Sequence, residues 1–269
     1  VLMSGILMFL TKLKARRQMR FQFQTPRLVA NVNSFLRTSC EAMLHPDTLA
    51  YLLRRLPVRV LEDLRHAMIY KLLRKKVFEK DRLLGKYYLV AFDGTGFLVY
   101  REPHCEHCLT REQGGTILYY HPVLEAKLVT SSGFSLSIAT EFIENPNAAV
   151  DKQDCEQKAF LRLSERLKQD FPQLSICVLL DGLYASRTVF ERCRTYDWRY
   201  LVTFKEGSAP AVFGEYERLK AAGAKQHAAT RGEVPQQYWW VNDVDFGGRP
   251  LNVLECREGD PEARSRRFV

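Results

Sequence analysis

The sequence contains no apolar run long enough to cross a membrane. Its opening stretch, VLMSGILMFL, is apolar over only ten residues, whereas a membrane-spanning helix needs about 20. The first basic residues, Lys12 and Lys14, follow this stretch instead of preceding it, so we expect the stretch to be a core-facing helix and not a secretory signal peptide. The cysteine count is odd, seven, and favours reduced thiols over a framework of disulfides. We therefore expect a cytoplasmic protein with no membrane partner.

Several common catalytic signatures are also missing. The chain has no nucleophile elbow of a Ser/His/Asp hydrolase, no P-loop and no dinucleotide-binding fingerprint, which excludes those enzyme classes. It also lacks internal repeats and low-complexity linkers. With 269 residues, 46% of them hydrophobic, the chain can bury a full core and has room for one large domain or two modest ones.

The positive charge is concentrated in the first third of the chain. Residues 1–86 hold 18 Lys/Arg and 6 Asp/Glu, a balance of +12, whereas residues 87–269 hold 22 and 25, a balance of −3. Such an asymmetry indicates a basic part that meets polyanions and a separate part with acidic chemistry. Basic surface binds nucleic acid through phosphate contacts, although a solvated basic helical face would give the same composition.

Residues 1–85 are predicted to form a basic helical region. Helices are expected over 1–20 and 30–43, and another is expected to begin with Asp47 as its N-cap and to end at Pro57. The next helix carries an apolar stripe that we expect to face the core. A cationic helix beside a catalytic domain could grip a DNA backbone, so DNA contact is expected from this region. The stripe consists of Leu61, Leu64, Met68 and Leu72.

Residues 86–205 show strands that alternate with helices. The order of elements, β-β-β-α-β-α-β, predicts an α/β fold with a mixed sheet flanked by helices. The second and third strands are separated by the turn 131–133 and should form a hairpin. The last two strands are joined through a helix and should be parallel, with a right-handed crossover. The expected strands are 86–92, 117–129, 134–143, 175–181 and 199–204, and the expected helices are 151–170 (N-cap Asp151) and 186–197.

Residues 206–269 form a third region with a weaker signal. EYERLKAA (215–222) can form a short helix, and two strands are expected at 237–246 and 250–256, joined by the turn FGGRP. Lys205 and Arg231 are candidates for phosphate contacts.

Two acidic residues follow apolar runs of the same form. YLVAF runs into Asp93, and ICVLL runs into Asp181; a glycine follows each. Such runs predict buried strands, and ligands bind at the carboxyl ends of strands in open α/β sheets. We therefore hypothesise that Asp93 and Asp181 end neighbouring strands and jointly hold Mg²⁺ or Mn²⁺, which prefer carboxylate oxygens. The alternative is that each aspartate only starts a turn.

Two further sites are candidates for metal-related roles. Asp154 lies near the start of the expected helix 151–170, where it is either a helix-capping acid or a carboxylate near the metal site. HCEHC (104–108) contains Cys105 and Cys108 at the spacing of half a zinc site. The remaining ligands would come from the histidines within reach; the alternative is a loop that bears thiols and imidazoles without metal. Those histidines are His104, His107 and His121.

The ordered motifs AFDGTG, HCEHCLTRE, TILYYHPVLEAKLV, KQDCE and LLDGLYAS resemble DDE-type transposases of bacterial insertion sequences over about residues 45–205. The resemblance implies a ribonuclease H-like core, with Asp93 as the first catalytic acid and Asp181 as the second. It also implies a magnesium-dependent enzyme that cleaves double-stranded DNA at the element ends, transfers strands to target DNA and works as a homo-oligomer. Lys152, Asp154 and Glu156 match a recurring segment to which the resemblance assigns no role.

The resemblance also implies a third catalytic acid, a glutamate on a later helix, within a stretch that this sequence lacks. Glu255 lies on an expected strand before that point and is not promoted to the role. The strands over 238–256 resemble a β-rich insertion that precedes that helix in similar enzymes. We therefore expect the chain to be a fragment that stops before its third acid.

Three hypotheses follow from the sequence. The first is a metal-dependent DNA transposase, truncated or whole. The second is a catalytically inactive remnant of a transposase that binds DNA. The third is a nucleic-acid-binding module stabilised by zinc at Cys105 and Cys108.

Overall fold

The computed structural model divides into two compact units, Val1–Leu64 (unit 1) and Arg65–Val269 (unit 2). Lys205, one of the expected phosphate contacts, lies outside the residues that the structure describes. In the described part of the chain no helix has both the length and the apolar character needed to span a bilayer. The described residues are 1–204, 207, 209–259 and 266–269.

Unit 1 is helical and packs around a small core. Met19, Phe23 and Leu49 are buried at its centre, and partly buried apolar side chains such as Leu7 and Leu28 pack against them. The single helix expected over 1–20 is broken, because α1 ends at Leu10 and a turn follows. The helices are α1 (Leu2–Leu10), α2 (Met19–Gln22), α3 (Pro26–Leu36) and α4 (Pro46–Leu53).

Prolines set the starts of two of these helices. The Thr25 hydroxyl accepts from the Leu28 amide at 3.4 Å, and α3 begins at Pro26, four residues before the expected start. The expected N-cap Asp47 is wrong, because α4 begins at Pro46 with His45 as its cap. Proline fits the first helical position because that position needs no amide donor, so the capping residue falls immediately before it.

Helix α5 (Val58–Arg74) presents a different face to the core from the one expected. Leu61, Leu64 and Met68 are 44%, 52% and 59% exposed, whereas Ile69 is 3% exposed. In unit 2, Arg65 donates to the Thr140 hydroxyl at 2.6 Å, on the same side of the helix as Ile69. The expected stripe is therefore wrong as a core face for Leu61, Leu64 and Met68, whereas its last member, Leu72, is partly buried and packs against the core. Periodicity predicted the helix, but α5 has apolar residues on more than one side.

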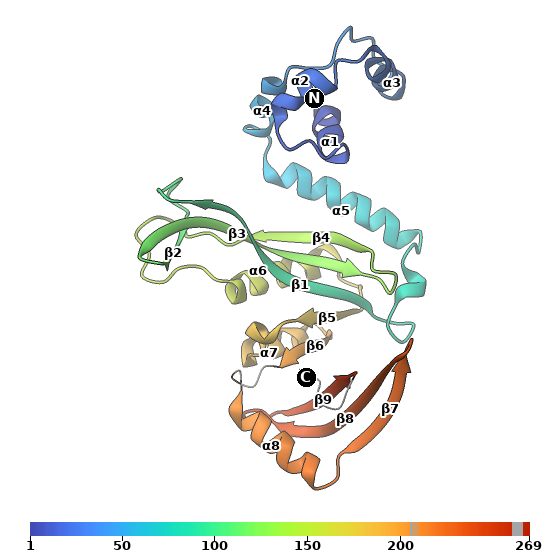
Figure 1. The fold of residues 1–269 in the computed structure, drawn as a ribbon, viewed down its shortest axis with the longest axis vertical. Helices are drawn as coiled ribbons and strands as arrows, with labels where there is room; N and C mark the ends of the chain where they lie inside the picture. The colour runs from blue at the N-terminus through green and yellow to red at the C-terminus, as the bar shows by residue number, and fades with distance from the viewer. Residues whose placement is uncertain (205–206, 208, 260–265) are drawn as a thin grey trace. The chain divides into compact units, whose positions relative to one another are not determined.

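Unit 2 is built on a ten-stranded mixed sheet with the strand order β2-β3-β1-β5-β6-β10-β9-β8-β7, and β4 pairs with β3 (Figure 1). The neighbours β1, β5 and β6 are parallel, and the other described pairs are antiparallel. The strands are β1 (Tyr88–Tyr100), β2 (Leu109–Gln113), β3 (Thr116–Val129), β4 (Ser135–Phe142), β5 (Ile176–Leu180), β6 (Arg199–Phe204), β7 (Lys225–Arg231), β8 (Val234–Asp245), β9 (Pro250–Glu258) and β10 (Arg266–Phe268).

The sequence predicted much of this sheet. The hairpin of β3 and β4, the parallel pairing of β5 with β6, and the pair β8 and β9 are confirmed. Strands β2, β7 and β10 were missed, because their short and mostly polar sequences carry little alternating hydrophobicity. Strand β1 was expected to end before Asp93 but continues to Tyr100, so this expectation is wrong. Beyond Ala91 it keeps its antiparallel partner β3, which sustains the strand without β5.

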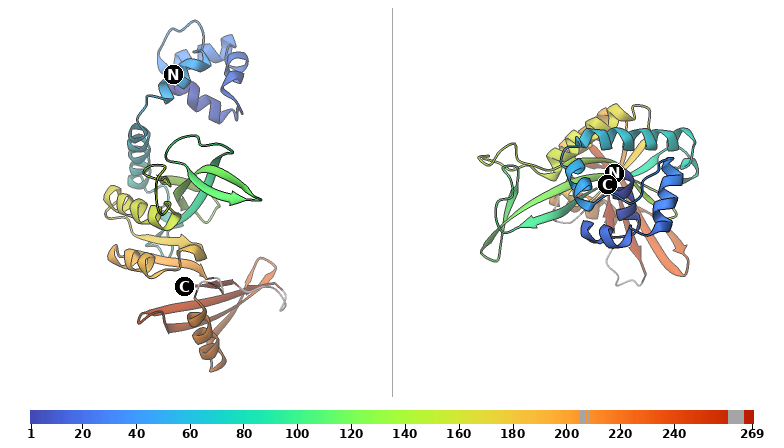
Figure 2. Two further views of the ribbon diagram at one scale, coloured as in Figure 1. Left: turned by 90° about the vertical axis from the view of Figure 1, so that its left-hand side faces the viewer. Right: turned by 90° about the horizontal axis from the view of Figure 1, so that it is seen from above.

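Among the described residues of unit 2, the α-helices beside the sheet are the end of α5, α6 (Glu156–Asp170), α7 (Arg187–Thr195) and α8 (Pro210–Ala221). Helix α6 packs on β3 and β4, α7 on β6, and α8 on β8 (Figures 1 and 2). The expected N-cap Asp151 is wrong: α6 begins only at Glu156, after Cys155. The reason is local, because Gln153 and Asp154 are hydrogen-bonded to Thr110 and Asn145 and do not enter the helix.

Candidate acidic site and cysteine–histidine cluster

Asp93 and Asp181 lie at the same level of two neighbouring parallel strands. The ladder between β1 and β5 pairs Tyr88 with Ile176 and ends at Ala91 with Leu179. Each aspartate lies two residues beyond this last pair, Asp93 within β1 and Asp181 directly after β5. Adjacent strands lie about 4.8 Å apart, so the two backbones reach the same end of the sheet side by side. Both residues are exposed.

Asp181 also has the turn role that was the alternative explanation for it. Its Oδ1 accepts from the Leu183 amide at 2.9 Å, and it caps the 3₁₀ helix Gly182–Tyr184. Capping fixes the orientation of the carboxylate at the end of β5. The turn role and a ligand role are compatible, because a carboxylate can accept at more than one site.

Glu156, the first residue of α6, brings a third carboxylate to this place. Its carboxyl group lies so close to Gly94 that a Cβ atom at position 94 would overlap it. Gly94 directly follows Asp93 on β1. The Tyr184 hydroxyl donates to Glu156 Oε2 at 3.0 Å, which holds the glutamate from the side of β5. Glu156 therefore lies beside the strand that carries Asp93, close to the end of the β1–β5 pair.

The titration of Tyr184 reflects this gathering of acids. Burial, followed by the neighbouring Glu156 carboxylate, raises the pKa of Tyr184 well above its ordinary value, and Asp181 and Asp93 add to the rise. One hydroxyl is thus within electrostatic reach of all three carboxylates. The ring of Tyr184 is fixed by an edge contact with Phe160, which itself packs against Phe92 on β1.

Sequence reasoning gave no role to Glu156. The residue was noticed only as part of the segment KQDCE, and its position 63 residues after Asp93 carries no local signal. The only pattern that pointed to it was the occurrence of this segment in the resemblance. Its proximity to Asp93 results from the packing of α6 on β3 and β4.

The structure places Asp154 in an ion-pair network. Its carboxylate is 2.6 Å from Arg162, and it accepts from the Glu144 amide at 3.3 Å. The side chain of Asp154 is 7% exposed. Arg162 also pairs with Glu141 at 2.6 Å, and the hydrogen bonds that it donates to Asp154 raise the pKa of the guanidinium. These contacts tie the segment before α6 to the helix itself.

Glu255 is placed far from the acidic site in the strand order, on β9. It is 1% exposed and contacts Lys220 at 2.9 Å, Arg267 at 3.3 Å and the Tyr216 hydroxyl at 2.9 Å. These partners lie on α8 and β10. The residue therefore joins three elements of the C-terminal part of the sheet.

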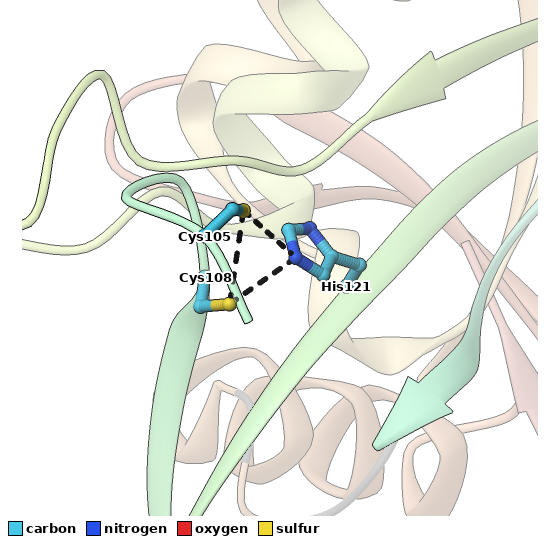
Figure 3. Close-up of side chains that lie close together, drawn as sticks. All are labelled: Cys105, Cys108 and His121. Atoms are coloured by element: carbon cyan, nitrogen blue, oxygen red, sulfur yellow. Dashed lines mark hydrogen bonds between the residues drawn. The ribbon is translucent and has the colours of Figure 1, made fainter. Parts of the chain in front are cut away.

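A second cluster combines two sulfurs and an imidazole nitrogen (Figure 3). Cys105 and Cys108, from the loop between β1 and β2, both approach His121 Nε2 on β3, at 3.3 and 3.2 Å. The two sulfurs are 3.8 Å apart. In the described part of the chain, no other group of three or more Cys, His, Asp and Glu residues has ligand atoms that all lie within 4.8 Å of one another.

The two other histidines of this region lie outside the cluster. His107 Nδ1 is 2.8 Å from the Asn145 carbonyl. The ring of His104 stacks on Tyr100, with centroids 4.4 Å apart. Of the histidines considered from the sequence, His121 is thus the one that meets the cysteines.

Comparison with known proteins gives little further information. No family model matches the chain, and no curated protein matches it. The structure is similar to a solved one described as the piggyBac transposase synaptic complex with hairpin DNA, with a TM-score of 0.42 and 10% sequence identity. The match covers 99% of this chain and 50% of that chain, so this chain spans half the length of the protein it matches. At these values the likeness does not establish a shared activity.

Proposed function

We propose that the protein is a metal-dependent DNA transposase of the DDE type, with Asp93, Asp181 and Glu156 as its acidic residues. The observation that carries the proposal is that Asp93 and Asp181 lie at the same level of two neighbouring parallel strands, with the Glu156 carboxylate against Gly94, the next residue of β1. The ordered motifs of the sequence support the same interpretation. In this proposal the core of 86–205 is ribonuclease H-like and residues 206–269 are the β-rich insertion.

The residues present fit a divalent cation such as Mg²⁺ or Mn²⁺. Such ions take carboxylate oxygens as ligands, and Asp93 and Asp181 offer them from exposed positions at the same level of the sheet. The missing side chain of Gly94 provides the space in which the Glu156 carboxylate lies. When bound, such ions activate the attacking oxygen and stabilise the leaving oxygen in phosphodiester chemistry.

The protein groups have distinct tasks in this proposal. Asp93 and Asp181 concentrate negative charge where the cation binds. The pKa of Tyr184 is raised above the already high value of a tyrosine, so the hydroxyl stays a donor and orients Glu156. Glu156 is then the third carboxylate within this chain, in place of the later glutamate that the resemblance implied.

The basic N-terminal region is proposed to hold double-stranded DNA. Unit 1 carries 10 Lys/Arg and 4 Asp/Glu, a balance of +6. Arg16, Arg17 and Arg20 are exposed. Exposed cations of this kind bind phosphates without sequence preference, which suits a region that positions the duplex. Assembly as a homo-oligomer on paired DNA ends and action in the cytoplasm remain proposals from the resemblance and the sequence.

The test is cleavage of a supercoiled plasmid by the full chain with Mg²⁺ or Mn²⁺. Asp93→Asn, Asp181→Asn and Glu156→Gln are each expected to lower nicking at least a hundredfold, while Asp151→Asn, an exposed acid outside the cluster, retains it. Wild-type nicking by all three variants would refute the acidic site. A salt-dependent gel shift with no nicking by the parent chain would instead identify the alternative, an inactive DNA-binding remnant.

A further inference from the structure

The loop after β1 is held against β3 by a contact that ordinary hydrogen bonding explains poorly. Cys105 Sγ and Cys108 Sγ both lie within 3.3 Å of the same atom, His121 Nε2. This nitrogen has one lone pair or one hydrogen in its plane, and either can serve one good hydrogen bond. A disulfide is also excluded as the cause, because the sulfurs are 3.8 Å apart and a disulfide bond is about 2.05 Å long.

The sulfur–sulfur distance equals the edge of a metal-centred tetrahedron, and the two sulfur–nitrogen distances are slightly shorter than such an edge. Zinc binds thiolate sulfur at about 2.3 Å and imidazole nitrogen at about 2.0–2.1 Å. Tetrahedral angles then place two sulfurs about 3.8 Å apart and sulfur and nitrogen about 3.6 Å apart. The observed separations are 3.8 Å for the sulfurs and 3.3 and 3.2 Å for sulfur and nitrogen.

The opposite nitrogen of His121 has the partner that a metal-bound histidine usually has. His121 Nδ1 is 3.5 Å from Glu144 Oε1. A carboxylate there favours hydrogen on Nδ1 and leaves the Nε2 lone pair directed at the two sulfurs. His121 is 6% exposed and Cys108 is 7% exposed, so two of the three ligands are shielded from water.

We propose that Cys105, Cys108 and His121 bind one zinc ion, with Glu144 as the carboxylate that orients the histidine. Binding converts two thiols to thiolates and releases their protons to solvent. His104, whose ring centroid lies 6.4 Å from that of His121, or a water supplies the fourth ligand. The site shares no ligand with the carboxylates proposed above.

The position of the site gives the ion a structural task. The loop between β1 and β2 is fastened to β3 through the ion. Next to it, Asn145 donates to the Cys108 carbonyl at 2.9 Å and accepts from the Asp154 amide at 3.1 Å. Asp154 lies two residues before Glu156, so the metal-held loop also supports the segment that leads into α6.

The experiment is metal analysis of the full chain purified without chelators, followed by exchange of the metal for Co²⁺. We expect one zinc per chain, and a Co²⁺ spectrum with thiolate charge-transfer bands. X-ray absorption should show two sulfurs at about 2.3 Å and nitrogen at about 2.0–2.1 Å. Failure to bind stoichiometric zinc even after its addition, or a Co²⁺ spectrum without thiolate bands, would overturn the proposal. These measurements on the parent chain decide the question even if ligand variants fail to fold.

Variants test Cys108 as a zinc ligand and Glu144 as the residue that orients His121. Cys108→Ser should abolish stoichiometric zinc, whereas Cys40→Ser, at an exposed free cysteine of unit 1, should retain it. Glu144→Gln should weaken zinc affinity about ten- to a hundredfold, as loss of an orienting partner typically does. Its matched control is Glu106→Gln, beside His107 at 3.8 Å, which should leave affinity unchanged. Equal zinc affinities of the two glutamine variants would show that Glu144 does not orient His121.

Discussion

The carboxylate of Glu156 occupies the space that a side chain at position 94 would fill. Gly94 follows Asp93, so this contact brings the start of α6 against the strand that carries the first aspartate. The contact also makes Gly94 a position where one methyl group should disturb the proposed site without adding or removing a charge.

Gly94→Ala is expected to lower metal-dependent DNA cleavage by about a hundredfold, because displacement of a catalytic group by about 1 Å has this effect. The added methyl would displace Glu156, whose carboxyl group is in contact with Gly94. The control is Gly96→Ala on the same strand, where a Cβ meets nothing within 4 Å. Plasmid nicking and thermal unfolding are to be measured for both. Equal nicking by the two variants would contradict the role of Glu156.

Tyr184→Phe removes the hydroxyl that donates to Glu156 while keeping the ring that packs on Phe160. A hydrogen bond to a charged group contributes about 1.5–3 kcal/mol to the free energy of unfolding. Because Glu156 is only partly buried, water can replace the donor. We therefore expect the free energy of unfolding to fall by an amount near the lower value. Urea unfolding measures it. Tyr51→Phe, at an exposed tyrosine, should stay within about 0.5 kcal/mol of the parent. A loss no larger than that of Tyr51→Phe would show that the hydrogen bond is not a stabilising one.

Glu255→Gln should destabilise the protein by about 3–5 kcal/mol, because it removes one partner of a buried ionic group. Glu255 is 1% exposed and is shared by Lys220 and Arg267. Glu258→Gln on the same strand is the matched control, since its side chain is 43% exposed and its pair with Arg231 spans 3.9 Å. Chemical denaturation should place Glu258→Gln within about 0.5 kcal/mol of the parent; comparable losses in both variants would argue against the buried network.

The folded state should lose stability at alkaline pH. Burial raises the pKa of Cys193 from 9.0 to about 12, so the folded state keeps this proton to higher pH than the unfolded state does. Its stabilising contribution is complete below about pH 9 and is lost as the pH rises toward about 12. Burial also raises the pKa of Cys177, which acts in the same direction.

Urea unfolding between pH 8 and pH 10.5 checks this dependence. Cys193→Ala should show a weaker decline than the parent, because one of the groups with a raised pKa is gone. Cys40→Ala, at an exposed cysteine, should keep the decline of the parent. A decline of the same steepness in Cys193→Ala would mean that other groups govern the alkaline limit.

DNA binding should depend on the exposed arginines of unit 1. Removal of one phosphate-binding cation should lower the slope of log affinity against log salt by about one, so Arg16→Ala combined with Arg17→Ala should lower it by up to about two. The control pair is Arg187→Ala with Arg218→Ala, exposed arginines already paired with glutamates at 3.0 and 2.7 Å. Fluorescence anisotropy with duplex DNA over a salt series measures the slopes, and identical slopes for the two double variants would exclude DNA binding by Arg16 and Arg17.

The sequence by itself determined the strands that lead into Asp93 and Asp181 and predicted that these strands are neighbours. The two apolar runs are 88 residues apart, and the parallel ladder has the same offset, Tyr88 with Ile176. Two similar apolar runs that each lead into Asp-Gly therefore predicted that these strands are neighbours, although β1 itself continues past Asp93. The hairpin of β3 and β4 was predicted for a similar reason, because alternation and a turn are local signals.

Only the tertiary structure decided which side chains from distant segments of the chain come into contact. Glu156 meets Gly94, and His121 meets Cys105 and Cys108, through packing between segments 13 to 62 residues apart in the chain. The inward face of α5 was likewise decided by its contacts at Arg65 and Ile69. Local periodicity encodes the type of an element and its turns, but which of its faces is buried, and next to which partner, depends on the arrangement of the whole sheet.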